Sequence, residues 1–184
     1  MIPASSATRS ARGSEVVAAG RRLLEEEGPE ALTMRRLAER VGIRAPSLYK
    51  HLPDKAALEA AIIATGFEEA AATFERAVEG VGEGPGNGRG ALVALAAAYR
   101  RFALEHPHLY RLMNNGPLPR AHLPAGLENR TAAPLLRAAG SQDRARAVWA
   151  FAHGMVMLEL DQRFPPDADL DAAWHAGIAA FQAG

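Results

Sequence analysis

The chain has 184 residues, 48% of them apolar and 23% charged, and its formal net charge is zero. These values are ordinary for a globular protein and allow one large domain or two small ones. The absence of cysteine excludes disulfide bonds and thiolate metal sites, and no apolar run approaches the roughly 20 residues of a transmembrane helix. Residues 1–13 lack the apolar stretch of a signal peptide, so we expect a disordered leader and a cytoplasmic protein that does not enter a membrane.

Charge is distributed unevenly along the chain. Residues 1–55 contain ten Lys and Arg against seven Asp and Glu, whereas residues 56–184 contain eleven against fourteen. A basic N-terminal segment on an acidic body suggests that only one end of the protein meets phosphate groups.

Apolar residues recur at helical spacing along the whole chain and no segment alternates as a strand does, which predicts an all-α fold. The first helix is expected at 14–27 and ends at Gly28-Pro29. Thr33 is a suitable N-cap for a short second helix. Gly42 ends this helix at a position where a left-handed residue is common.

The segment RAPSLYKHLPDK, residues 44–55, holds two prolines that leave room for about two turns of helix. Pro46 suits the first helical position of a short third helix. Pro53 ends this helix, so that Asp54 can cap a long fourth helix at 54–79.

The C-terminal two thirds of the chain are also predicted to be helical. The glycine-rich segment at 80–90 follows no strand and lacks the Lys-Ser/Thr ending of a P-loop, so we interpret it as a flexible linker and not as a phosphate-binding loop. Residues 114–126 are expected to form an irregular, mobile loop. Further helices are expected at 91–106, 107–114, 126–139, 141–164 and 170–182.

The second and third helices, joined by a short turn with glycine, have the outline of a helix-turn-helix motif. In this motif the second helix enters the major groove of DNA, which is ~12 Å wide. Leu48 and Leu52, four residues apart, are expected to face the core. This leaves the polar side chains of Ser47, Tyr49, Lys50 and His51 for phosphate contacts. Lys55 adds a cation at the start of the next helix, and Thr33 adds a further anion-binding group at the start of the preceding one. A solvated helix face can also carry such a run, so the prediction depends on the whole constellation.

Residues 31–62, ALTMRRLAERVGIRAPSLYKHLPDKAALEAAI, closely resemble the DNA-binding segment of the tetracycline-repressor (TetR) family. The matching positions follow in order without a gap: Leu32-Thr33, Leu37-Ala38, Gly42-Ile43, Leu48-Tyr49, His51, Lys55 and Leu58. The resemblance implies a homodimeric transcription regulator, usually a repressor, with a helical effector domain behind the DNA-binding domain.

The resemblance also assigns roles to individual side chains. It implies that Thr33, Ser47, Tyr49, His51 and Lys55 bind phosphates, and that the residues facing bases are Arg35, Arg44, Ala45, Pro46 and Lys50. Two positions depart from the family pattern. Leu52 replaces the usual Phe, and Ala45 caps a helix poorly and offers a base only its methyl group. Direct readout would therefore depend more on Arg44 and Lys50, because Arg or Lys bound to guanine is the commonest specific contact.

The predicted helix at 141–164 is apolar on two sides, which indicates burial against its own core and against a partner chain. Ala150 and Gly154, four residues apart, would let another helix approach closely. Together with the final helix, it is predicted to form a four-helix dimer interface. The residues predicted for this interface are Ala147, Ala150, Phe151, Gly154, Leu158, Trp174, Ile178 and Phe181.

Two segments of the C-terminal region resemble one TetR subclass, whose signature is Trp…His-Gly. They are WAFAHGMVMLEL at 149–160 and YRRFALEHPHLYRLM at 99–113. An effector pocket for a small apolar or amphipathic ligand is predicted, because such pockets are mostly apolar with a few polar groups. Its candidate residues, each of which could also be ordinary core, are Phe67, Phe74, Phe102, Tyr110, Met113, Trp149 and His153.

Two histidine features have competing interpretations. His153 on an apolar helix face is more often a hydrogen-bonded core residue than a ligand contact or pH switch. His106 and His108, with Glu105 beside them, suggest a metal site but lack a third ligand at clear spacing, so no metal and no cofactor is predicted.

The leading hypothesis is a homodimeric repressor with a helix-turn-helix domain at 14–58 and a ligand-binding and dimerisation domain at 59–184. It binds a pseudo-palindromic operator and is released by a small-molecule effector that tilts the 54–79 helix. The alternatives are a DNA-binding or interaction protein without an effector, and a small enzyme. No nucleophile–base pair, metal cluster or cofactor loop supports catalysis.

Overall fold

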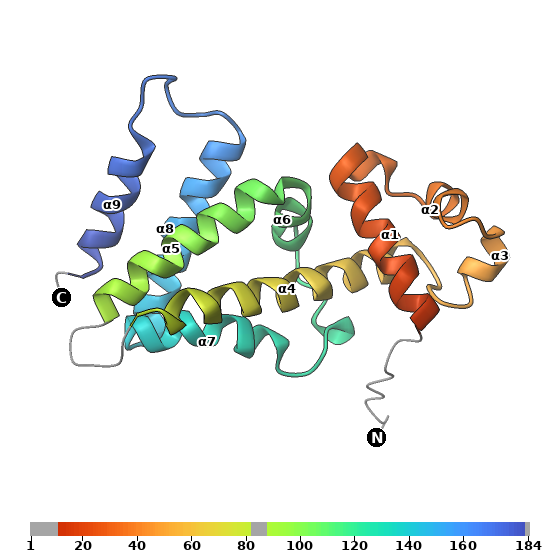
Figure 1. Ribbon diagram of the computed structural model, residues 1–184, viewed down its shortest axis with the longest axis horizontal. Helices are drawn as coiled ribbons and strands as arrows, with labels where there is room; N and C mark the ends of the chain where they lie inside the picture. The colour runs from red at the N-terminus through yellow and green to blue at the C-terminus, as the bar shows by residue number, and fades with distance from the viewer. Residues whose placement is uncertain (1–10, 82–87, 183–184) are drawn as a thin grey trace. The chain divides into compact units, whose positions relative to one another are not determined.

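The computed structural model describes residues 11–81 and 88–182 of the chain. Every regular element in these two ranges is a helix, which confirms the predicted all-α class (Figure 1). The α-helices are α1 (Ala11–Glu27), α2 (Met34–Arg40), α3 (Ala45–Leu48), α4 (Lys55–Glu79), α5 (Gly88–Glu105), α6 (Pro107–Asn114), α7 (Leu127–Ala139), α8 (Gln142–Leu160) and α9 (Leu170–Ala180). Two short 3₁₀ helices are η1 (Pro29–Ala31) and η2 (Arg120–His122).

Helix ends differ from the sequence prediction at a few places. α1 begins at Ala11, so residues 11–13, expected in the leader, are helical and Gly13 is buried; the rest of the leader lies outside the described residues. α5 begins at Gly88, inside the predicted glycine-rich linker, of which residues 82–87 are not described. α8 stops at Leu160 because the chain turns there, with Gln162 in the left-handed region at φ 51°.

The chain divides into two compact units. Unit one consists of residues up to Phe67 together with His108–Leu127, and unit two consists of Glu68–Pro107 and the residues from Glu128 onward. α4 contributes residues to both units, and the predicted domain boundary at residue 58 lies within this helix.

The core of unit one forms where α1 and α4 pack closely. Gly20 permits this approach, because a Cβ atom there would lie 2.9 Å from Cδ1 of Leu58. Gly66 plays the same role further along α4, where a Cβ atom would lie 2.6 Å from the sulfur of Met113. The largest side chains with almost no exposure in this unit are Leu23, Leu24, Leu32, Leu37, Leu48, Leu58, Ile62, Leu109, Tyr110 and Leu127.

Unit two is built mainly from α5, α8 and α9, which pack against one another (Figure 1). Its core contains a polar network. The Glu159 carboxylate accepts hydrogen bonds from Trp174 Nε1 at 2.5 Å and from Arg100 Nε at 3.0 Å, and its side chain is only 6% exposed. Arg100 also binds the exposed carboxylate of Asp171 at 2.5 Å. Because the buried carboxylate has two donors, this network links all three helices without an unpaired charge.

No helix within the two described ranges combines the length and the apolar character needed to cross a bilayer.

Candidate nucleic-acid interface

α2 is fixed at both ends by local hydrogen bonds. The Thr33 hydroxyl accepts a hydrogen bond from the backbone N–H of Arg36 at 3.3 Å, as predicted for an N-cap. At the other end Gly42 adopts φ 65°, and the backbone N–H of Ile43 donates to the carbonyl of Ala38 at 3.0 Å. With a second bond from Gly42 N–H to the Glu39 carbonyl at 3.2 Å, these contacts form a Schellman motif.

α3 is shorter than the two turns expected from its prolines. It has four residues and is followed by a turn in which His51 N–H donates to the Leu48 carbonyl at 2.9 Å. Arg44 is the N-cap residue and makes no side-chain cap, which places Pro46 at the second helical position instead of the first. Leu48 and Leu52 are 0% and 5% exposed, so the predicted core contacts of this segment are confirmed.

The start of α4 follows the prediction closely. Asp54 Oδ1 accepts a hydrogen bond from the backbone N–H of Ala57 at 2.7 Å, which caps the helix. Lys55 is the first helical residue, and its ammonium lies 3.4 Å from Glu59. This pair is largely solvated, so it restrains the cation only weakly.

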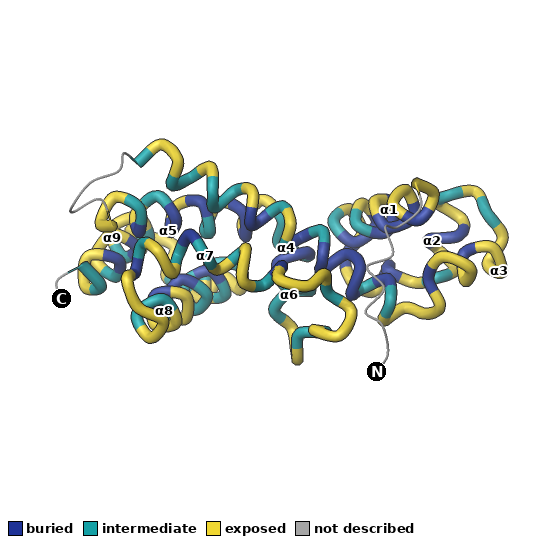
Figure 2. The backbone as a smooth tube through the Cα atoms, turned by 90° about the horizontal axis from the view of Figure 1, so that it is seen from below, coloured by how far each residue is buried: buried dark blue, intermediate teal, exposed yellow. Residues whose placement is uncertain are grey.

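All ten side chains predicted to contact DNA are exposed. In Figure 2 most of α3 and of the turn that follows it has the colour of exposed residues. Tyr49, which by residue type alone would more often be buried, is 50% exposed because Leu48 occupies the core position beside it. The exposed set is Thr33, Arg35, Arg44, Ala45, Pro46, Ser47, Tyr49, Lys50, His51 and Lys55.

The cations of this surface differ in how firmly they are held. Arg35 lies 3.9 Å from Glu39, and its side chain is 85% exposed. Arg44 and Lys50 make no ion pair with any residue in the described ranges. These three side chains can therefore reorient toward DNA at little energetic cost.

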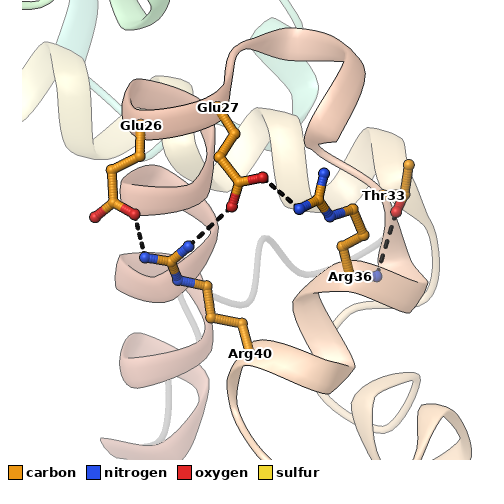
Figure 3. Close-up of polar contacts among 5 residues, drawn as sticks. All are labelled: Glu26, Glu27, Thr33, Arg36 and Arg40. Atoms are coloured by element: carbon orange, nitrogen blue, oxygen red, sulfur yellow. Dashed lines mark hydrogen bonds and ion pairs between the residues drawn. The ribbon is translucent and has the colours of Figure 1, made fainter.

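Two further arginines of α2 are bound by carboxylates of α1, and the sequence prediction missed them. Arg36 binds Glu27, and Arg40 binds both Glu26 and Glu27, its Nη1 lying 3.2 Å from Oε1 of Glu27 (Figure 3). We call these four residues the Glu–Arg cluster. The signal was present in the sequence as three consecutive glutamates at the end of one helix and a run of arginines in the next, but their pairing depends on how the two helices pack.

The residues predicted for an effector pocket are divided between the two units. Phe67, Tyr110 and Met113 belong to unit one, while the other four belong to unit two. Phe74 and Phe102 contact each other with ring centroids 6.4 Å apart. Trp149 is 49% exposed and lies beside His153, with ring centroids 6.1 Å apart.

Burial lowers the pKa of His153 from its ordinary value, so its neutral form is favoured near pH 7. No group of three potential ligands suitable for a metal ion occurs in the described part of the chain, the His106 and His108 region included.

A cavity of about 190 Å³ lies between α5 and α9, away from these candidates. It is smaller than the usual pocket for a drug-sized ligand, which is roughly 300–1,000 Å³. Its lining residues are Val93, Ala96, Ala97, Arg100, Asp171, Trp174, His175 and Ile178.

The residues predicted for a dimer interface fall into two groups. Trp174 and Ile178 are buried inside unit two, at 6% and 3% exposure. Phe151 packs between α8 and α9, with its ring 5.7 Å from that of Trp174 and 5.9 Å from that of Phe181. The outer side of α8 carries the rest: Ala147, Ala150 and Leu158 are exposed, and a Cβ atom on Gly154 would meet nothing within 4 Å.

Comparison with known proteins matches both the N-terminal and the C-terminal part of the chain to family models. Residues 16–62 match the family model of bacterial regulatory proteins of the tetR family, and residues 92–181 match the model of the tetracyclin repressor-like C-terminal domain. The chain belongs to the TetR family. Its helix-turn-helix is therefore the DNA-binding domain of a TetR-family transcriptional regulator, and members of this family are not enzymes.

Similar proteins agree with the TetR assignment. An uncharacterized HTH-type transcriptional regulator of Mycobacterium tuberculosis, Rv0681, is 28% identical over 171 residues, which are 88% of this chain and 75% of that protein. A protein of unknown function from Rhodococcus sp. RHA1 has the same fold, with a TM-score of 0.77 at 24% identity over 98% of this chain and 97% of that one. A TetR variant from Acinetobacter baumannii AYE, in complex with minocycline, has a TM-score of 0.66 at 27% identity over 93% of this chain and 94% of that one.

Proposed function

We propose that this TetR regulator is a homodimeric, cytoplasmic repressor that binds a pseudo-palindromic operator through α3 and is released by a small-molecule effector. The observation that carries the DNA-binding part is the arrangement around α3. Leu48 and Leu52 anchor this short element to its own core, while the ten family-pattern positions around it are all exposed. A helix placed in this way can enter the major groove with its N-terminal residues against base edges.

Within this surface the side chains divide by chemistry. Thr33, Ser47, Tyr49, His51 and Lys55 offer hydroxyl, imidazole and ammonium groups to phosphate oxygens, which fix the register but carry no sequence information. Arg44 and Lys50 flank the short helix and are the main candidates for reading bases, because Ala45 and Pro46 have no polar side-chain atoms.

Homodimerisation is supported by the outer side of α8. Its exposed positions Ala147, Ala150 and Leu158, with open space at Gly154, leave small and apolar groups on one side of a helix whose other side is buried. Two half-sites one DNA turn apart, ~34–36 Å, require a fixed separation between two recognition helices, which a dimer supplies. We also propose that this C-terminal domain is of the Trp…His-Gly subclass, on the basis of residues 149–160.

The effector is proposed to be small and apolar or amphipathic. One solved TetR relative was crystallised with minocycline, and the predicted pocket residues are mostly aromatic. An effector that tilts α4 would change the separation of the recognition helices, with a coupling free energy of about 1–3 kcal/mol.

One observation favours the alternative, a regulator without a small-molecule effector. Phe102 and Tyr110 are only 4% and 2% exposed, so neighbouring side chains already cover both rings where a ligand would bind. Titrating a bound operator with ligands that bind the purified protein separates the two proposals, because only an effector lowers operator affinity.

The DNA-binding proposal is tested by selecting bound duplexes from a random pool and then comparing variants on the selected site. Tyr49→Phe and Lys55→Ala should weaken all sequences alike, whereas Arg44→Ala should relax the preference at one position by about 1–3 kcal/mol. A uniform loss for Arg44→Ala would assign Arg44 to a phosphate instead. Affinity that does not fall steeply with salt would contradict phosphate binding altogether.

A further inference from the structure

The Glu–Arg cluster forms an alternating chain of charges between α1 and α2. Glu26 binds Arg40, Arg40 also binds Glu27, and Glu27 also binds Arg36 (Figure 3). The four side chains are between 32% and 51% exposed, so none of them is hidden from solvent. An alternating network of this kind holds its members more firmly than an isolated surface pair does.

Three of the four residues of the cluster lie at the unfavourable end of their own helix, whereas Arg40, in the last turn of α2, lies at the favourable end. Glu26 and Glu27 are in the last turn of α1, where the helix dipole disfavours negative charge. Arg36 is in the first turn of α2, where the dipole disfavours positive charge. Neither placement stabilises its own helix through the dipole, and the opposite charges on the neighbouring helix offset this.

The arginines of α2 differ in their exposure and in how firmly they are paired with carboxylates. Arg35, one of the predicted DNA contacts, is 85% exposed and only loosely paired. Arg36, the next residue, is 44% exposed and is bound to Glu27. Arg40 is 32% exposed and is bound to two carboxylates. Carboxylates therefore already engage part of the charge and some of the N–H donors of these two arginines, which leaves them less available to another anion than Arg35.

Glu26 and Glu27 also supply two of the negative charges that offset the basic residues of the DNA-binding segment. Residues 25–55 contain six basic and six acidic residues, so the segment that must meet a polyanion is neutral. Attraction to DNA of any sequence rises with the number of phosphates that are neutralised. In this segment the acidic residues at the end of α1 offset that attraction.

We propose that Glu27, assisted by Glu26, holds Arg36 and Arg40 against α1 and thereby withholds them from DNA phosphates, which keeps the sequence-independent affinity for DNA low. The first helix of a helix-turn-helix crosses the DNA backbone, so long cationic side chains on α2 are within reach of phosphates once they are released. Arginine is also the side chain best suited to phosphate oxygens. This inference rests on the proposed DNA-binding function and adds Glu27 as a residue that limits the sequence-independent affinity for DNA.

The test uses the full chain and a fluorescently labelled duplex of random sequence, with anisotropy titrations between roughly 50 and 200 mM salt. Glu27→Gln removes the only carboxylate that Arg36 contacts within the described residues and one of the two that Arg40 contacts. We expect the affinity at low salt to rise about threefold to tenfold and the salt slope to steepen by about 0.9 for each arginine that reaches a phosphate. Glu26→Gln releases Arg40 in part and should shift both quantities less, in the same direction.

Two controls separate release of the arginines from simple loss of negative charge. Glu30→Gln removes the same charge from an exposed glutamate of η1, which makes no ion pair in the described ranges; its salt slope should match that of the unmodified chain. The second control adds Glu27→Gln to a chain that already carries Arg36→Gln and Arg40→Gln. There the gain in affinity should disappear, because no bound arginine remains to be released.

Several outcomes would overturn the proposal. An equal gain for Glu30→Gln, or a gain that persists without the two arginines, would reduce the effect to overall charge. A loss of affinity for Glu27→Gln, with a lowered melting temperature, would make the cluster a purely structural link. If the unmodified chain bound no duplex at any salt concentration, the proposed function would fail as well, whereas salt-dependent binding that Glu27→Gln leaves unchanged would overturn the cluster proposal alone.

Discussion

At the scale of single residues, Gly177 on α9 shows how one absent methyl group positions an aromatic core. A Cβ atom at this position would overlap the ring of Phe151, which is also in contact with Trp174 and Phe181. In an open helix, Gly→Ala would stabilise by about 1 kcal/mol. Here overpacking costs about 1–3 kcal/mol, so we expect Gly177→Ala to lower the free energy of unfolding, as measured by chemical denaturation. The penalty should shrink in a Phe151→Leu background, where the ring is absent, and an undiminished penalty would contradict this explanation.

Asp171 supplies a prediction about pH. Its hydrogen bond to Arg100, with the attraction of the guanidinium, lowers the pKa of this carboxyl below its ordinary value. A depressed carboxyl pKa contributes stability above the unfolded pKa, about 3.9. That contribution is lost as the pH falls from there through the folded value. We expect an NMR titration of the Asp171 side chain to show a midpoint below that of a free aspartate, and Arg100→Gln to raise it. An unchanged midpoint in the variant would mean that Arg100 is not the cause.

The sequence was sufficient to predict residues whose roles are local. Thr33 and Asp54 cap helices within three positions of themselves, and Leu48 and Leu52 face inward because of their spacing alone. The left-handed backbone conformation of Gln162 and the ion pairs of the Glu–Arg cluster were not predictable in this way. The pairing of Glu27 with Arg36 and Arg40 requires knowing the angle at which two helices pack, which is a tertiary property.

At the scale of elements, the turn between α2 and α3 depends on the backbone of Gly42. Its φ of 65° lies in the left-handed region, and the Schellman hydrogen bonds that end α2 require it. We expect Gly42→Ala to reduce the free energy of unfolding by about 1–2 kcal/mol and to weaken DNA binding, because α3 would start in the wrong direction. Gly42→Asn is the matched control, since asparagine tolerates this conformation. Thermal unfolding and duplex binding of both variants check the prediction, and equal losses for Ala and Asn would point away from the backbone.

Helix bounds were predicted most accurately where a capping residue or proline fixes them. α6 matches its predicted range of 107–114, and α4 begins one residue after its predicted cap. The prediction was less accurate where tertiary packing determines the end of a helix. α1 extends to Ala11 although small residues give no periodic signal there, and α8 ends four residues early although Phe164 continues its apolar spacing.

At the scale of the whole molecule, the proposed dimer makes the outer side of α8 different from other exposed apolar surface. Leu158 on α8 and Leu104 on α5 are both 42% exposed in the single chain. In a dimer formed through α8, Leu158 would be buried against the partner and Leu104 would stay in water. A charge at an interface core is strongly unfavourable, whereas a charge on a free surface has little effect.

We therefore expect Leu158→Glu to produce monomers at concentrations where the unmodified chain and Leu104→Glu are dimeric, as measured by sedimentation velocity. Because a monomer places only one recognition helix on DNA, the same variant should also lose the tight binding that depends on two half-sites, while random-duplex binding per protomer persists. If Leu158→Glu and Leu104→Glu each dissociated the dimer, the result would show only that unit two tolerates no added charge. Dissociation by neither would move the interface away from α8, and a monomeric Leu158→Glu that still bound a two-half-site duplex at full strength would separate dimerisation from operator binding.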